Sequence, residues 1–339
     1  MTNDEKINYL EQLKENIELN REFDIIDLFG KLHPADIADL IDNLKEEEKI
    51  HLFSLLDIEK ASDVILELND ISKEQIIEDL SDKKLTEIID EMDSDDAADF
   101  IAELDEEQAK AVLEGIQPEE SEEVKELLKY DEDTAGGIMQ SELISIREDA
   151  TVMDAVKKIV NISDEIEDVY NVFVIDEEDR LVGTIPLQKL IISKRYQRVS
   201  EAIDHSIPSV HTNVDQEEVA RMFEKYDLIA LPVVDDQNRL LGRITVDDIV
   251  DVMEEETSED LYRIAGLHED DSVFNRPMTS VKKRLPWLYL NLLTALVSAL
   301  VIGFFEDTIK VMVVLAVFMP VVAGLGGNAG SQTLTLIVR

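Results

Sequence analysis

Apolar residues recur every 12 positions over the first third of the chain. The period is marked by Leu44, Leu56, Leu68, Leu80, Met92 and Leu104. Each of these residues closes a short apolar pattern, such as Ile37 to Ile41. A period of this length fits one brief helix and a turn per repeat, stacked as in solenoid proteins. Residues 1–130 are therefore predicted to form an α-helical, superhelical domain, right-handed or irregular, which we call the N-domain.

Polar residues mark where the repeat helices should begin. His33-Pro34, Ser81-Asp82 and Ser94-Asp95-Asp96 have the composition of N-caps and first helical turns. Caps and solvated helix faces therefore offer a simple explanation for several acids of the repeats. These acids are Asp63, Glu67, Asp95, Asp96 and Asp99.

A second repeat follows a polar, glycine-ended boundary at Lys129 to Gly137. Residues 172–183 align without a gap on residues 231–242, which lie 59 positions later. Each copy predicts a strand, an acidic turn, a strand and a helix, and a further helix precedes it, at 151–160 and 215–226. The pattern resembles a tandem pair of CBS domains with an α/β fold, at residues 138–197 and 198–253. CBS pairs occur in many unrelated proteins, so this resemblance alone names no function.

The CBS resemblance raises the question of a bound adenine nucleotide. Such pairs often hold ribose and phosphate with a Thr-x-x-Asp motif, which the second half has at Thr245 and Asp248. The equivalent positions of the first half are Pro186 and Lys189. The resemblance therefore implies nucleotide binding, ATP included, for one half only.

Acidic residues crowd the helix predicted after Thr245. They are Asp247, Asp248, Asp251, Glu254, Glu255, Glu256, Glu259 and Asp260. Like charges three or four residues apart destabilise a helix by a few tenths of a kcal/mol per pair. Either a cation compensates this repulsion, or the helix is solvated and tolerates it.

Two apolar segments near the end of the chain predict membrane helices. Residues 285–305 are 21 positions without a charge, with Trp287 and Tyr289 at their start, as at a membrane interface. Lys282, Lys283 and Arg284 precede them, so the positive-inside rule places residues 1–284 in the cytosol. Glu306 to Lys310 is then a short outer turn, and Arg339 returns to the inside.

Polar and glycine residues interrupt the second apolar segment, which begins at Val311. Gly324, Gly326, Gly327, Asn328, Gly330, Ser331 and Gln332 follow its first apolar half. Asn328 and Gln332 lie four apart, hence on one helix face. Amides at membrane depth are tolerated where they contact other protein or line a wet path. Alternatively, the glycines only allow membrane helices to approach closely.

The charge of the chain is confined to the part before the membrane segments. The sequence has 77 acidic and 32 basic residues, for a net charge of −45. After Arg284, two acids and two bases cancel, so the whole −45 belongs to residues 1–284. Nucleic acid would be repelled by this surface, whereas cations are its natural partners. Cysteine is absent, and the N-terminus lacks the apolar core of a signal peptide.

The run from Pro320 to Gln332, PVVAGLGGNAGSQ, resembles the second membrane helix of the MgtE family of magnesium channels and transporters. The order of the preceding segments is similar to that family as well. The resemblance implies a homodimer with a cytosolic N-domain, a CBS pair, an acidic linker and plug helix at 254–284, and an all-α membrane domain from 285. The family has five membrane helices, so at Arg339 this sequence is expected to hold only the first two.

The family resemblance also implies a set of functional residues. Mg²⁺ prefers oxygen ligands and keeps several of its waters, which suits loosely arranged carboxylates. The implied regulatory ligands are Asp63, Asp95 and Asp99 in the N-domain, Asp215, Glu217 and Asp227 around the second CBS helix, and Asp248, Asp251, Glu256, Glu259 and Asp260 near the plug. Gly326, Gly327, Asn328 and Gln332 are the implied pore-lining residues.

The sequence thus favours a multi-pass protein of the cell membrane that transports Mg²⁺ and closes when cytosolic Mg²⁺ is abundant. The alternative is a membrane-anchored CBS module that senses an adenine nucleotide. An enzyme is disfavoured, because no nucleophile and base are paired and no phosphate-binding glycine loop follows a strand. The five histidines are scattered and fit surface positions: His33, His51, His205, His211 and His268.

Overall fold

The computed structural model describes residues 3–162, 169–204, 206, 208–267, 277–312 and 314–338. It consists of two compact units, Met1–Ile249 and Val250–Arg339. His205, His268 and Arg339, for which the sequence made predictions, lie outside the described residues.

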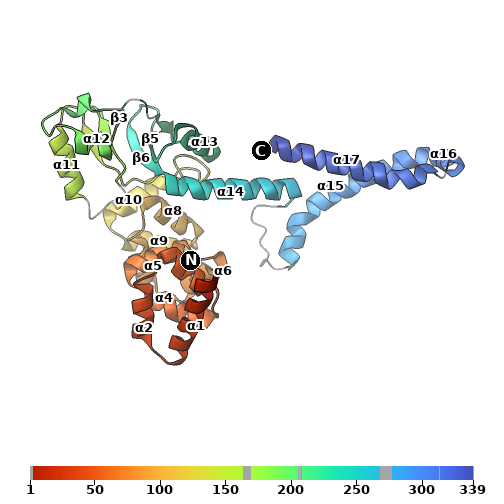
Figure 1. Ribbon diagram of the computed structural model, residues 1–339, viewed down its shortest axis with the longest axis horizontal. Helices are drawn as coiled ribbons and strands as arrows, with labels where there is room; N and C mark the ends of the chain where they lie inside the picture. The colour runs from red at the N-terminus through yellow and green to blue at the C-terminus, as the bar shows by residue number, and fades with distance from the viewer. Residues whose placement is uncertain are drawn as a thin grey trace. The chain divides into compact units, whose positions relative to one another are not determined.

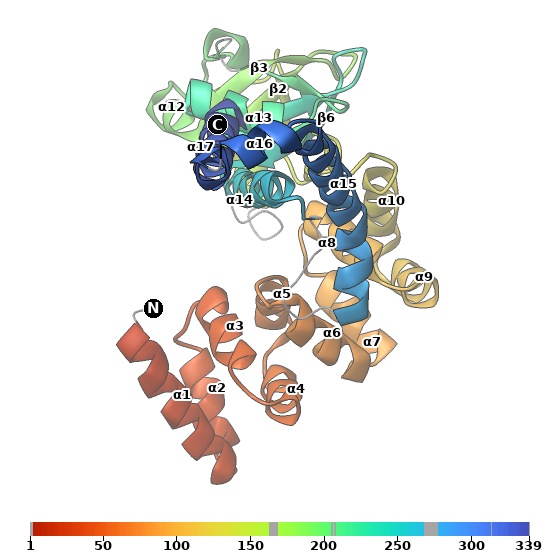
Figure 2. The ribbon, with the colours of Figure 1, turned by 90° about the vertical axis from the view of Figure 1, so that its right-hand side faces the viewer.

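The first half of unit one is entirely helical (Figures 1 and 2). Its helices are α1 (Asn3–Glu18), α2 (Glu22–Phe29), α3 (Pro34–Asp42), α4 (Glu46–Ser54), α5 (Ile58–Leu66), α6 (Asp70–Asp79), α7 (Asp82–Ile89), α8 (Ser94–Glu103), α9 (Glu106–Gly115) and α10 (Pro118–Leu127). From α3 to α10 each helix begins 12 residues after the previous one. The prediction of one helix per repeat is confirmed.

Capping and burial explain why each period forms one helix. Asp57, Asn69 and Ser81 accept hydrogen bonds from backbone N–H groups of α5, α6 and α7, as N-caps do. The repeat leucines, such as Leu56 and Leu68, are buried after the helix ends. Helices two apart pack together: α3 on α5, α5 on α7, α7 on α9, α4 on α6 and α8 on α10. The stack therefore has an odd and an even layer.

The start of α8 differs from the prediction by one residue. Its N-cap is Asp93, and Ser94 is the first helical residue. The Ser94 hydroxyl consequently serves contacts outside the helix, with Ser141 and Glu142.

The second half of unit one holds two similar α/β copies. The first comprises β1 (Ser145–Arg147), α11 (Val152–Asn161), β2 (Asn171–Ile175), β3 (Leu181–Pro186), α12 (Leu187–Ile192) and the 3₁₀ helix η1 (Val199–Glu201). The second comprises β4 (Val210–His211), α13 (Gln216–Tyr226), β5 (Ala230–Val234), β6 (Leu240–Thr245) and α14 (Val246–Ala265). The predicted order of helices and strands is confirmed, whereas the short strands β1 and β4 were not predicted.

The two sheets have the same topology. Their strand orders are β1-β2-β3 and β4-β5-β6, with a parallel first pair and an antiparallel second pair. The hairpin registers also correspond, because Asn171 pairs with Pro186 and Ala230 with Thr245. The internal repeat of the sequence is therefore a repeat of structure.

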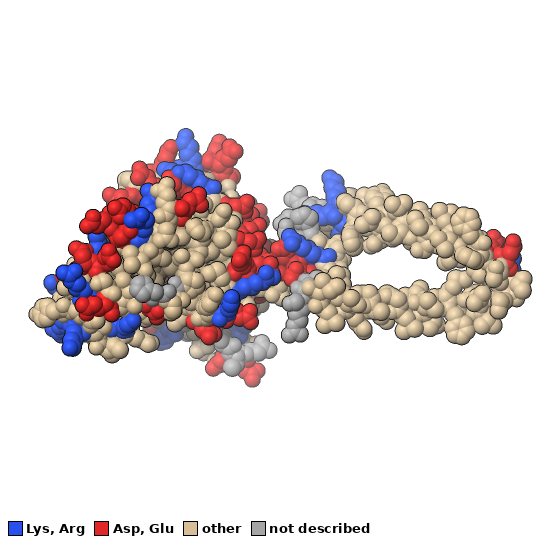
Figure 3. Space-filling view, turned by 90° about the horizontal axis from the view of Figure 1, so that it is seen from above, with Lys and Arg blue, Asp and Glu red and all other residues tan. Residues whose placement is uncertain are grey.

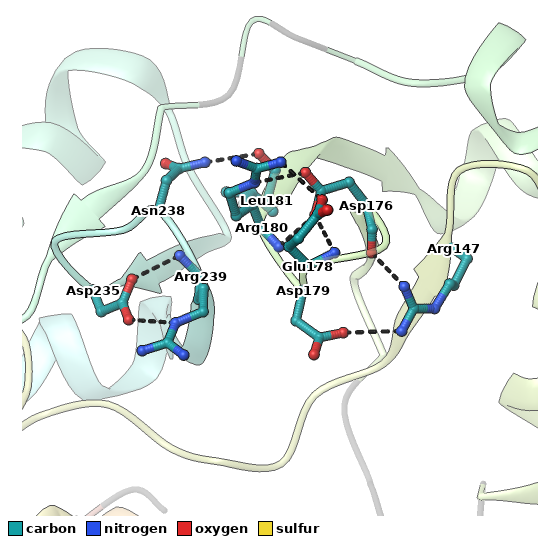
Figure 4. Close-up of polar contacts among 9 residues, drawn as sticks. All are labelled: Arg147, Asp176, Glu178, Asp179, Arg180, Leu181, Asp235, Asn238 and Arg239. Atoms are coloured by element: carbon teal, nitrogen blue, oxygen red, sulfur yellow. Dashed lines mark hydrogen bonds and ion pairs between the residues drawn. The ribbon is translucent and has the colours of Figure 1, made fainter.

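The turns of the two hairpins join each other (Figure 4). The Leu181 N–H donates to the Asn238 carbonyl at 2.9 Å, and the Leu240 N–H donates to the Asp179 carbonyl at 3.1 Å. Asp179 and Asn238 both have a φ of 61°, which short polar residues tolerate best after glycine. We call this contact the hairpin junction. It links the two copies through backbone hydrogen bonds.

Unit two contains α15 (Pro277–Phe304), α16 (Glu306–Val311) and α17 (Val314–Val338). Residues Ser280–Phe304 and Val314–Ile337 are long and apolar enough to cross a membrane. Charged side chains gather on unit one and are sparse on these helices (Figure 3). One expectation needs correction. The segment 306–310, predicted as a turn, belongs to the short helix α16, whereas α17 continues as a helix through the glycine-rich run.

Candidate functional site

A buried polar chain connects the N-domain to the second CBS copy. Asp95, in the first turn of α8, is only 5% exposed. Its Oδ2 accepts a hydrogen bond from Gln140 Nε2 at 3.4 Å, and Gln140 Oε1 accepts one from Arg243 Nε at 2.9 Å. Gln140 and Arg243 are likewise buried. We call Asp95, Gln140, Arg243 and the nearby Asp248 the acidic junction.

The electrostatics of Asp95 contradict its interpretation as a solvated helix-start acid. Burial raises the pKa of Asp95 well above its usual value, and the negative charges of Asp248, Asp96 and Asp93 raise it further. A carboxylate removed from water and placed among other acids needs a proton or a cation to compensate its charge. The oxygen donors of Asp95 and Asp248 are the type that Mg²⁺ prefers.

Asp248 also forms hydrogen bonds at the start of α14. Its Oδ2 accepts hydrogen bonds from the Thr245 hydroxyl at 2.7 Å and from the Thr245 N–H at 3.1 Å. Thr245 is buried, so its hydroxyl is committed to this helix start. In the first copy, Pro186 precedes α12 and Lys189 Nζ donates to the Ile203 carbonyl at 3.4 Å.

The other predicted ligands in unit one lie at separate places. Asp63 on α5 and Asp99 on α8 are exposed. Partial burial and then the charge of Glu59 raise the pKa of Asp63. Asp215 caps α13 by accepting from the Glu217 N–H at 3.0 Å. Asp227 ends the same helix, 12 positions after Asp215, so a rise of about 1.5 Å per residue places the two about 18 Å apart.

The remaining predicted ligands belong to the part of α14 in unit two. They are Asp251, Glu256, Glu259 and Asp260. Glu259 forms an ion pair with Arg263 one turn later. Within the described residues, no group of three His, Asp or Glu side chains is close enough to hold a metal ion. The structure thus brings together Asp95 and Asp248, and separates Asp215 from Asp227.

The predicted pore residues lie along α17. Asn328 and Gln332 occupy one face of this helix, as their spacing requires. A methyl group added at Gly326, Gly327 or Gly330 would meet no atom within 4 Å among the described residues. Among the described residues, no close contact accounts for these glycines.

Sequence reasoning missed several residues near α8. Gln140 and Arg243 were not predicted, since a pair 103 positions apart leaves no local pattern. An acidic cluster was also missed: Asp90, Glu120, Glu123 and Glu142. Burial raises the pKa of Glu120 to about 7, helped by the hydrogen bond and charge of Asp90 and by the charges of Glu123 and Glu142. In the sequence these acids look like any solvated helix face.

The histidines were predicted at the surface, and His33 and His211 are exposed.

A helical repeat domain, a CBS pair and two membrane-length apolar helices together define a CBS-containing membrane protein. The family model of the MgtE intracellular N domain matches residues 32–133, and that of the CBS domain matches residues 135–193 and 199–255. The magnesium transporter MgtE of Thermus thermophilus is 35% identical over 318 residues, which are 92% of this chain and 71% of that protein. The chain belongs to the MgtE family.

Two further comparisons agree with this assignment. The magnesium transporter MgtE of Enterococcus faecalis is 39% identical over 215 residues, which are 63% of this chain but only 47% of that protein. A solved structure, the cytosolic domain of the Mg²⁺ channel MgtE in complex with ATP, aligns with a TM-score of 0.68 at 33% identity. It covers 72% of this chain and 99% of that one.

Proposed function

We propose that this protein transports Mg²⁺ across the cell membrane and that its acidic cytosolic part senses Mg²⁺. Residues 1–284 then lie in the cytosol, and abundant Mg²⁺ closes the pore. Relatives named magnesium transporters support the transported ion. The observation that supports sensing is the acidic junction, where Asp95 of the N-domain is buried and lies near enough to Asp248 of the CBS pair for the negative charge of Asp248 to raise its pKa. The relatives that match most of this chain are named as magnesium transporters.

The physical basis of the sensing is charge compensation. Two carboxylates about 4 Å apart repel each other by roughly 4 kcal/mol at an effective dielectric constant of 20. A divalent cation between them reverses the sign of this interaction. Mg²⁺ at the acidic junction would therefore stabilise the contact between the N-domain and the CBS pair, and its loss would weaken that contact.

The other family-implied residues complete the proposal. Asp63, Asp99, Asp215, Glu217, Asp227, Asp251, Glu256, Glu259 and Asp260 would bind further regulatory ions, in more than one group. Gly326, Gly327, Asn328 and Gln332 would line the ion path in a homodimer. Unit one would have no nucleic acid partner, because its acidic surface would repel phosphates.

Limited proteolysis of the full chain in detergent micelles tests the sensing. We expect millimolar Mg²⁺ to protect the segment near Lys129, while KCl at matched ionic strength does not. Asp95→Asn should raise the Mg²⁺ concentration for half-protection at least about 10-fold, since a ligand charge is lost. Asp70→Asn, the same change at the exposed start of α6, is the control. Cleavage that ignores Mg²⁺ in the wild-type protein would overturn the sensor.

Transport is tested separately with liposomes that contain the protein and a Mg²⁺-sensitive dye. We expect Mg²⁺ entry that slows when Mg²⁺ is abundant on the face that carries residues 1–284. Absence of any Mg²⁺ flux above that of empty liposomes would overturn the proposed transport.

Nucleotide sensing is the second candidate. It is favoured by the structural similarity to a cytosolic domain solved with ATP and by the Thr245 and Asp248 motif. The use of both side chains to start α14, and Pro186 in the first copy, weigh against it. Protection from proteolysis by ATP without Mg²⁺ would make this the better function.

A further inference from the structure

The backbone of Gln140 is fixed to β6 of the second CBS copy. Its N–H donates to the Arg243 carbonyl at 2.8 Å, and the Arg243 N–H donates to the Gln140 carbonyl at 2.9 Å. A Cβ atom at the neighbouring Gly242 would lie 2.7 Å from the Gln140 carbonyl oxygen. Glycine at 242 therefore permits this close approach, and the position of Gln140 is set by the CBS pair.

The side chain of Gln140 has only one orientation that satisfies its neighbours. Arg243 Nε donates to Gln140 Oε1, and a guanidinium group can only donate. The amide nitrogen Nε2 must therefore point the other way, where Asp95 Oδ2 accepts its hydrogen bond. Gln140 is 4% exposed, and Arg243 and Asp95 are each 5% exposed, so water does not take the place of either hydrogen-bond partner of Gln140.

The next residue makes a parallel contact. The Ser141 N–H donates to Ser94 Oγ at 2.8 Å. Two consecutive residues of the loop, 140 and 141, thus hold the first two residues of α8, 94 and 95. The start of this N-domain helix is fixed to the CBS pair through that loop.

We propose that Gln140 is a positioning residue of the Mg²⁺ sensor, which holds the Asp95 carboxylate toward the second CBS copy, and that Arg243 fixes the direction of its amide. This inference rests on the proposed sensing function. A neutral amide donor suits the task because it orients a carboxylate without cancelling the charge that attracts the cation. Partners that orient ligands in this way typically change metal affinity 10- to 100-fold.

The test is the Mg²⁺ concentration for half-protection from proteolysis, together with the melting temperature without Mg²⁺, for the full chain in detergent. We expect Gln140→Met, which keeps the volume and loses the donor, to raise that concentration about 10-fold. Gln75→Met is the matched control, because Gln75 Nε2 also donates to a carboxylate, Glu46 Oε2 at 3.5 Å, away from the acidic junction. It should leave the concentration unchanged.

A double variant separates positioning from stability. Gln140→Met leaves the buried Arg243 Nε without its acceptor, which destabilises the fold. Gln140→Met combined with Arg243→Met removes both partners and should recover melting temperature, while the Mg²⁺ response stays weakened. Two results would overturn the positioning role without overturning the sensor. One is a double variant that recovers both stability and the Mg²⁺ response, and the other is a Gln140→Met variant with a wild-type Mg²⁺ response. A wild-type protein that ignores Mg²⁺ would overturn the sensor and this role together.

Discussion

At the scale of single residues, burial decides which of the many acids matter. Most carboxylates of unit one lie on exposed helix faces, where water screens their mutual repulsion. Asp95 and Glu120 show the largest effects, because burial and neighbouring acids raise the pKa of Asp95 well above its usual value and that of Glu120 to about 7. A raised pKa means that the folded state holds the proton more tightly than the unfolded chain does.

The raised pKa of Glu120 predicts a measurable dependence of stability on pH. Its folded pKa of about 7 exceeds its ordinary value of 4.5, so its stabilising contribution is complete below pH 4.5 and is lost as pH rises through 7. We expect Glu120→Gln to reduce the fall in melting temperature between pH 5 and pH 8.5. Glu119→Gln removes the same charge at an exposed neighbouring position and should leave that fall unchanged. Equal pH profiles for wild type and Glu120→Gln would contradict the prediction.

At the scale of elements, periodic patterns could be predicted from the sequence and non-local contacts could not. The 12-residue period and the repeated hairpins gave the helices α3 to α10 and the strands β2, β3, β5 and β6. Strands of two or three residues, such as β1 and β4, are too short for an alternating pattern. The helix α17 continues through its glycine-rich run, where the spacing of Asn328 and Gln332 had already placed both residues on one helix face.

The same contrast between local patterns and non-local contacts applies to the candidate site. Asp95 and Asp248 were predicted by family resemblance, whereas their surroundings depend on contacts between residues far apart in the chain. Gln140 is an example, since nothing in its local sequence indicates that Arg243 would bury and orient it.

The hairpin junction supplies a prediction at this scale. Asp235 accepts hydrogen bonds from the N–H of Arg239 at 2.8 Å, from the Arg239 guanidinium at 2.8 Å and from the N–H of Gln237 at 2.8 Å. These bonds lower the pKa of Asp235, with the backbone N–H of Arg239 the main cause. The stability that they contribute is present above the ordinary pKa and is lost as pH falls through the lowered value.

We therefore expect Asp235→Asn to lower the melting temperature at pH 7 and to lower it less at pH 3, below the ordinary pKa of 3.8. Asp236→Asn, next in sequence and exposed, is the control and should have little effect at either pH. A melting temperature of Asp235→Asn that differs from wild type by the same amount at both values would contradict the assignment.

At the scale of the whole molecule, the net charge of −45 creates a field that any cation weakens. Monovalent salt screens exposed charges, with a Debye length of about 10 Å at 0.1 M and 3 Å at 1 M. Buried charges are screened much less. The general acidity and the acidic junction should therefore respond differently to salt.

Raising KCl from 0.1 to 1 M should increase the melting temperature of wild type and Asp95→Asn by similar amounts. Adding 10 mM Mg²⁺ in 1 M KCl should increase it further in both, and more in wild type than in Asp95→Asn, because a buried carboxylate beside a second acid discriminates by charge and coordination. Calorimetric scans check both steps. Loss of the Mg²⁺ increment in 1 M KCl would show that Mg²⁺ acts as a general counterion.

The alternating layers of the N-domain restrict how its length can change. Each repeat helix packs on the helix two positions away, so odd and even helices occupy different layers. Because α8 is held by the loop of Gln140 and Ser141 and by α10, removing one 12-residue unit before α8 would leave Asp95 in place and move every earlier helix to the opposite layer. Removing two units would return the earlier helices to their own layers. Changes in the length of this domain that keep each earlier helix in its layer therefore come in steps of 24 residues.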